Sequence, residues 1–102
     1  YEKKGIFIEI VDLRSLIPLD KATIASTVKK TNRVLLLQEP SEMLGPMSEV
    51  AAYLTEHCFE YLDAPLIRCS SLNTPVPFHK KLERGYLARS RLNKKLNRLL
   101  AY

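Results

Sequence analysis

Few side chains in this sequence are placed to perform acid–base chemistry, and most of them stand alone. Asp12 and Arg14 close one apolar segment, and Glu39 closes another. The ends of parallel strands are where sites gather in α/β folds, so all three are candidates. A turn cap at Asp12 and a local ion pair at Arg14 are the structural alternative. No second carboxylate is fixed near Glu39, as paired acid–base catalysis would require. We therefore expect no catalytic residue in this chain.

The histidines and cysteines are too few for a built metal or redox centre. His57 stands within a helical segment beside its apolar stripe, where we expect a surface or interface histidine. His79 precedes Lys80, and its imidazole offers a proton-transfer group. Cys58 and Cys69 could share a zinc site with the two histidines only by long-range convergence. We expect two reduced thiols in an intracellular protein and no metal site. The three glycines form no phosphate-binding loop.

The apolar pattern predicts strands that alternate with helices. Short apolar runs are typical of strands covered on both faces, and we expect such strands at residues 6–13 and 33–38. Residues 66–69 are a candidate for a third short strand. A helix of about ten residues is expected between Asp20 as its N-cap and Asn32 as a left-handed stop. A second helix is expected at 47–62, where apolar residues recur every three or four positions. This order predicts a three-layer α/β/α sandwich with a mostly parallel sheet.

Each end of the chain has a pattern that is typical of a helix. Residues 1–4 have the pattern of the last turn of a helix that Gly5 stops, so we expect an earlier strand and helix to be absent from this chain. Residues 86–102 predict a basic amphipathic helix. We therefore divide the chain into an α/β domain at 1–87 and a helix packed on it at 88–102.

Positive charge is concentrated near the C-terminus. Residues 80–102 contain eight Lys or Arg and one acid, whereas the whole chain has a net charge of +5. Such a run could bind nucleic acid through phosphates, but only Tyr86 and Tyr102 are available there for base stacking. A solvated helix face is the simpler interpretation. No apolar run approaches the roughly 20 residues needed to cross a bilayer, so the sequence predicts no membrane span.

Four segments, taken in order, resemble the C-terminal domain of the transketolase superfamily. Within it, they are most similar to the beta subunits of the thiamine-diphosphate-dependent 2-oxo acid dehydrogenases, of pyruvate or branched-chain type. The segments are EIVDLRSLIPLD at 9–20, VKKTNRV at 28–34, YLDAP at 61–65 and NTPVPF at 73–78.

The resemblance implies a role in assembly within a larger oxidoreductase. It implies that thiamine diphosphate and magnesium are bound by other domains, and that this domain contacts an alpha subunit or fused alpha region, a second beta subunit and the lipoyl acyltransferase core. The expected location is the cytoplasm, or the mitochondrial matrix in a eukaryote. A transketolase or deoxyxylulose-phosphate synthase is the alternative, with Arg14 and Arg68 as the available phosphate ligands. A module whose basic helix binds nucleic acid or an acidic partner is a third possibility.

Aromatic residues and restricted backbone mark the expected subunit contacts. They fall in the helix at 47–62 and in the proline-rich loop that follows the third strand; the residues are Tyr53, Phe59, Tyr61, Pro75, Pro77 and Phe78. The carboxylate at Tyr102 is the expected anchor for the acyltransferase, although the surrounding basic charge disfavours a basic docking domain.

Overall fold

The computed structural model describes residues 1–74 and 79–102 of the chain. Two parallel strands form its centre, β1 (Leu35–Ser41) and β2 (Ile67–Ser71). The α-helices are α1 (Lys21–Thr31), α2 (Pro46–His57), α3 (Lys80–Tyr86) and α4 (Leu92–Leu100). Short 3₁₀ helices are η1 (Glu2–Lys4), η2 (Phe59–Tyr61) and η3 (Ala88–Arg91).

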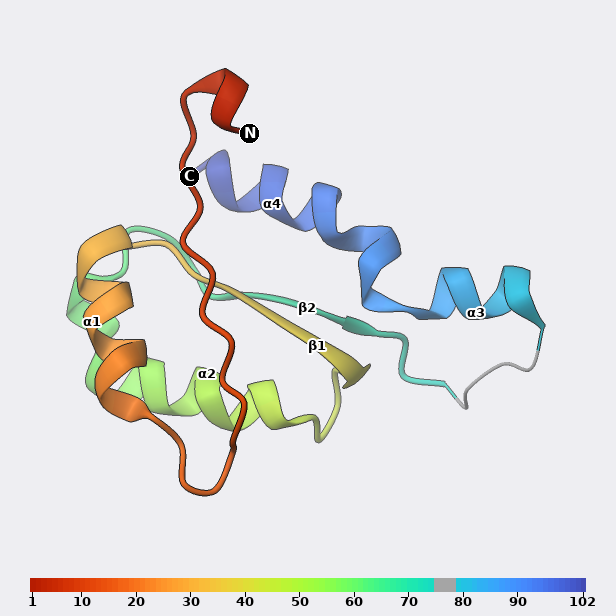
Figure 1. Ribbon diagram of the computed structural model, residues 1–102, viewed down its shortest axis with the longest axis horizontal. Coiled ribbons are helices and arrows are strands. Elements are labelled where there is room, and N and C mark those ends of the chain that lie inside the picture. The colour runs from red at the N-terminus through yellow and green to blue at the C-terminus, as the bar shows by residue number, and fades with distance from the viewer. Residues whose placement is uncertain (75–78) are drawn as a thin grey trace.

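Helices cover both faces of the small sheet, which confirms the predicted α/β class (Figure 1). On one face, Leu36 of β1 packs with Ile24 and Val28 of α1 and with Leu54 of α2. On the other face, a smaller apolar cluster joins the strands to α4; its members are Leu35, Ala64, Ile67 and Leu99. The sheet therefore positions two helical layers, with the larger core beneath α1 and α2.

The first α-helix forms where local capping predicts it. The carboxylate of Asp20 accepts hydrogen bonds from the backbone N–H of Thr23 at 3.1 Å and from its hydroxyl at 2.7 Å. Asn32 adopts a left-handed conformation with φ 64° and ends the helix. Both ends of the helix are thus determined by side chains within a few residues of it, as capping requires.

Residues 6–13 do not form a strand, so that prediction is wrong. A strand needs a hydrogen-bonded neighbour, and this segment lies against α1 instead. Glu9 accepts a hydrogen bond from the hydroxyl of Thr27 at 3.0 Å and forms an ion pair with Lys30 at 2.8 Å. Phe7 and Ile10 are 81% and 86% exposed. The apolar residues of this segment are therefore typical of a strand, but in the described part of the chain the segment pairs with no other strand.

Two predicted helices are shorter than their apolar periodicity indicates. The helix expected at 47–62 ends at His57, where Cys58 leaves helical geometry, and η2 then keeps Tyr61 packed on the core. The helix expected at 86–102 is interrupted by extended backbone at Leu87 and begins again as η3 and α4.

Strand β1, which was expected at residues 33–38 with both faces buried, is covered only in part. Leu36 and Gln38 of β1 are buried, but Leu37 on the opposite face is 51% exposed. The apolar contacts on that face involve Leu35 and α4. The prediction of two buried faces is therefore wrong at Leu37.

Candidate functional site

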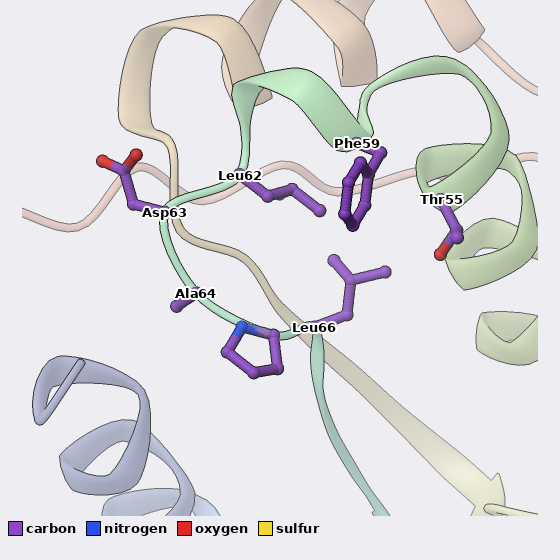
Figure 2. A pocket seen from close by; sticks show the side chains of 7 residues that line it. Thr55, Phe59, Leu62, Asp63, Ala64 and Leu66 are labelled. Carbon is purple, nitrogen blue, oxygen red and sulfur yellow. The ribbon is translucent and has the colours of Figure 1, made fainter.

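An open apolar cavity of about 460 Å³ lies beside the C-terminal end of α2. Thr55 comes from α2, Phe59 from η2, and the rest of the lining comes from the segment that leads to β2: Leu62, Asp63, Ala64, Pro65 and Leu66. The side chains of Phe59, Leu62 and Leu66 point toward one another across it, while Asp63 points away (Figure 2). Phe59 is 70% exposed, which leaves a large apolar side chain at a hollow surface.

Two of the other aromatic residues expected at an interface, Tyr53 and Tyr61, are partly covered by α1. Lys21 lies 5.4 Å from the ring centroid of Tyr53, and Lys29 lies 5.2 Å from that of Tyr61. Both rings also pack against the main core. Phe59 is therefore the most exposed of the three. Pro75, Pro77 and Phe78, which were also expected at an interface, lie outside the described residues.

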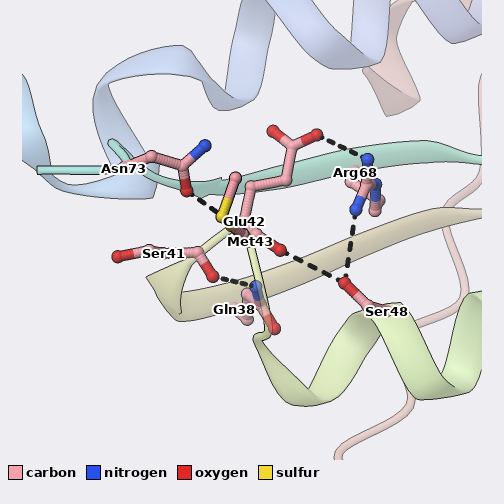
Figure 3. A network of polar contacts seen from close by, with 7 residues as sticks. All are labelled: Gln38, Ser41, Glu42, Met43, Ser48, Arg68 and Asn73. Atoms are coloured by element: carbon pink, nitrogen blue, oxygen red, sulfur yellow. Dashed lines mark hydrogen bonds and ion pairs between the residues drawn. The ribbon is translucent and has the colours of Figure 1, made fainter.

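A polar network closes the C-terminal edge of the sheet, between the end of β1 and the start of α2 (Figure 3). The guanidinium of Arg68 pairs with the Glu42 carboxylate at 2.8 Å and donates to the Ser48 hydroxyl at 3.2 Å. The amide of Asn73 accepts a hydrogen bond from the backbone N–H of Met43 at 2.9 Å. Arg68 is therefore engaged in structural contacts and not presented as a free phosphate ligand.

Gln38 and Gly45 hold this turn together. The buried Gln38 side chain donates to the carbonyl of Ser41 at 2.8 Å and accepts from the N–H of Met47 at 2.8 Å. A Cβ on Gly45 would lie 2.1 Å from the amide nitrogen of Gln38 and 2.5 Å from the carbonyl oxygen of Ser41. This pair was not predicted from the sequence. The pattern that could have indicated it is a polar residue inside an apolar strand, followed by a Gly-Pro pair at the start of a helix.

The candidate acid–base residues are dispersed. Asp12 accepts a hydrogen bond from the backbone N–H of Arg14 at 3.2 Å, which confirms the turn-cap interpretation of Asp12. His57 lies at the end of α2, 4.8 Å from the Tyr53 ring between centroids, and His79 accepts a hydrogen bond from the N–H of Lys81 at the start of α3. Glu39 is exposed. The structure does not gather these groups into one site.

Both cysteines are free and buried. The thiol of Cys69 donates to the carbonyl of Ala88 at 3.3 Å. Burial raises the pKa of this thiol, opposed by the weaker effects of the positive charges on Arg91 and Lys95. In residues 1–74 and 79–102, no group of three or more His, Cys, Asp or Glu is arranged to hold a metal ion.

Two arginines, Arg33 and Arg91, donate hydrogen bonds to backbone carbonyls. Arg33 donates to the backbone carbonyl of Tyr102 at 2.5 Å, and Tyr102 is 52% exposed. Arg91 donates to the carbonyls of Gly85 and Tyr86 at 2.9 and 3.0 Å, and also to that of Ser70. Arg91 is therefore not part of the solvated basic face that was expected for the helix at residues 86–102. None of the helices in the described part of the chain has the length and apolarity needed to cross a bilayer.

A parallel β1–α2–β2 unit with helices on both faces defines an open α/β domain. Comparison with protein families refines this class. The family model "Transketolase, C-terminal domain" matches residues 1–91, and the chain therefore belongs to that family.

Curated relatives agree with this assignment. The chain is 44% identical over 82 residues to "Pyruvate dehydrogenase E1 component subunit beta-1, mitochondrial" of Oryza sativa, covering 80% of this chain and 22% of the relative. It is 41% identical over 87 residues to "2-oxoisovalerate dehydrogenase subunit beta" of Bacillus subtilis, covering 84% of this chain and 27% of the relative. The "Acetoin:2,6-dichlorophenolindophenol oxidoreductase subunit beta" of the same bacterium is 39% identical over 85 residues, with 83% and 25% covered. The chain thus spans about a quarter of the length of these relatives.

Proposed function

We propose that this chain is the C-terminal assembly domain of the beta part of a thiamine-diphosphate-dependent 2-oxo acid dehydrogenase. The observation that carries the proposal is the transketolase C-terminal match over residues 1–91, together with relatives named as dehydrogenase beta subunits. The whole protein decarboxylates a 2-oxo acid and passes the acyl group to a lipoyl carrier. It works in the cytoplasm, or in the mitochondrial matrix in a eukaryote; the rice relative's name describes that protein as mitochondrial.

As part of this proposal, thiamine diphosphate and magnesium are assigned to other domains of the whole protein, because the region shared with this chain is only about a quarter of the relatives' length. This domain contributes contacts with an alpha subunit or fused alpha region, with a second beta subunit and with the acyltransferase core.

Activity of the whole protein tests the assignment of function. The full-length protein that carries this chain is purified with its alpha partner and supplied with pyruvate or 2-oxoisovalerate. We expect release of carbon dioxide that requires both thiamine diphosphate and magnesium. Transfer of a ketol group between sugar phosphates, without 2-oxo acid decarboxylation, would assign the protein instead to a transketolase or deoxyxylulose-phosphate synthase.

The cavity beside Phe59 supports the assembly role. A large apolar side chain that is 70% exposed beside an apolar cavity has the composition of an interface core. Buried aromatic residues carry much of the binding energy at such contacts, often about 2 kcal/mol or more each.

A matched pair of variants tests this contact. In the full-length protein, F59S is expected to weaken subunit association by about tenfold or more, measured by sedimentation velocity over a concentration series. The control is L82S, which removes a 64% exposed apolar residue from α3, away from the cavity. Equal association of F59S, L82S and the unmodified protein would remove Phe59 from the interface.

A further inference from the structure

We propose that a second, polar cavity, at the end of β2, binds a small oxyanion, a phosphate or carboxylate group, through Ser71, Arg91 and Lys95. The cavity has a volume of about 180 Å³. A single water needs roughly 10–15 Å³ on the same measure, so there is room for a phosphate-sized group. Its lining comprises Glu42, Ser70, Ser71, Leu72, Asn73, Arg91 and Lys95.

Unpartnered hydroxyls are the first sign of a ligand. Ser70 and Ser71 are 5% and 2% exposed, and neither hydroxyl has a hydrogen-bond partner among the described residues. Buried polar groups without a partner cost free energy, and in native proteins they call for an explanation. Successive side chains alternate along a strand, so Ser71 shares the face of Cys69, whose thiol reaches η3. The Ser71 hydroxyl therefore lies on the side of the strand from which Arg91 and Lys95 approach.

Two cations, Arg91 and Lys95, complete the site. Arg91 is held by three backbone carbonyls, which fixes its guanidinium and leaves two of its five N–H donors for a ligand. Lys95 is partly buried and lies four residues further along the chain. Neither side chain forms an ion pair with any of the acidic side chains that the structure describes. Both positive charges also act on the thiol of Cys69. Burial raises the pKa of this thiol, and the charges of Arg91 and Lys95 partly offset the rise.

Glu42 does not cancel this charge. Its carboxylate is bound by Arg68 at 2.8 Å, and its backbone carbonyl accepts from Ser48 at 3.2 Å. The cavity also lies at the carboxyl end of parallel strands, where open α/β sheets bind their ligands. Hydroxyl, guanidinium and ammonium donors together match the acceptor oxygens of a phosphate or carboxylate.

Calorimetric titration of the full-length protein tests the proposal. Inorganic phosphate and acetate are titrated separately at constant ionic strength, with chloride as the reference anion. Saturable binding of either anion is expected, and the one that binds more tightly identifies the source of the oxyanion. S71A and K95Q are each expected to weaken this binding by about tenfold or more, the loss of one charge-assisted contact.

The control variant is K94Q, which removes a neighbouring exposed charge that does not line the cavity. Its affinity is expected to stay within twofold of that of the unmodified protein. S71A removes only a hydroxyl that has no partner, so it is expected to fold normally even if K95Q does not. No saturable binding beyond chloride, or binding that is unchanged in S71A and K95Q, would overturn the proposal.

Discussion

Replacing Gly45 by alanine tests the closed turn between β1 and α2. The backbone of Gly45 has φ −76°, which any residue adopts, so the cost of a side chain is steric and not conformational. The new Cβ would lie 2.1 Å from the amide nitrogen of Gln38 and 2.5 Å from the backbone oxygen of Ser41. Gln38 must therefore move, and its two 2.8 Å hydrogen bonds, to Ser41 and from Met47, are disturbed together.

The expected loss in the free energy of unfolding follows from these contacts. Overpacking a buried position costs about 1–3 kcal/mol, and leaving a buried polar group unsatisfied costs about the same again. G45A is therefore expected to lower the free energy of unfolding by about 2–6 kcal/mol. At a urea dependence of about 1–2 kcal/mol per molar, the unfolding midpoint falls by roughly 1 M or more.

Urea denaturation of the chain, followed by circular dichroism at the helical band, measures this loss. The matched control is G85A in α3, where an added Cβ meets no atom within 4 Å. Alanine in place of a helical glycine gains about 0.5–1 kcal/mol, so the two variants are expected to shift stability in opposite directions. A G45A midpoint within error of the unmodified chain would refute the account of the turn.

Three further results are expected from the structure. The pKa of Glu9 is lowered, first by its hydrogen bond from Lys30 and then by that from Thr27. The ionised carboxylate therefore stabilises the contact of residues 6–13 with α1 above about pH 4.3, and this stabilisation is lost as the pH falls through the lowered pKa of the folded chain. Proteolysis of residues 6–13 should accelerate in that acidic range, and an E9Q variant should show no such pH dependence. L54A should destabilise the chain by about 2–5 kcal/mol because Leu54 is fully buried, whereas L44A, at a 96% exposed site, should stay within about 0.5 kcal/mol; equal denaturation midpoints would contradict this. Cys69 should react with a thiol reagent at least about tenfold more slowly in the folded chain than in urea, because burial encloses the thiol and raises its pKa; equal rates would show that it is accessible.

The elements that were predicted correctly are those whose ends depend on residues close by in the sequence. Helix α1 has both caps, Asp20 and Asn32, within its own segment. The strand expected at 6–13 failed because a strand depends on a partner elsewhere in the chain, whereas Glu9 binds to α1. The helix expected at 86–102 is divided at Leu87, where the backbone is extended, and Arg91 beyond this break donates hydrogen bonds to carbonyls of β2 and α3.

The candidate sites follow the same division. Phe59 was predictable as an aromatic residue near the end of an amphipathic helix, but its cavity forms only when the segment before β2 folds back beside η2. The polar cavity depends on Ser71 and Lys95, which are 24 positions apart in the sequence and become neighbours only in the fold. No local spacing reveals such a pair.

Isolation of the native protein tests the central claim most directly. An antibody against residues 80–102 is used to purify it, and its intact mass, its partners and its 2-oxo acid decarboxylation are measured together. The account predicts a chain about three to four times as long as this one, since 82 and 87 matched residues make up 22% and 27% of two relatives. It also predicts that this chain is purified with an alpha partner and is active only with thiamine diphosphate. A native chain near 11.7 kDa that carries no such activity would contradict it.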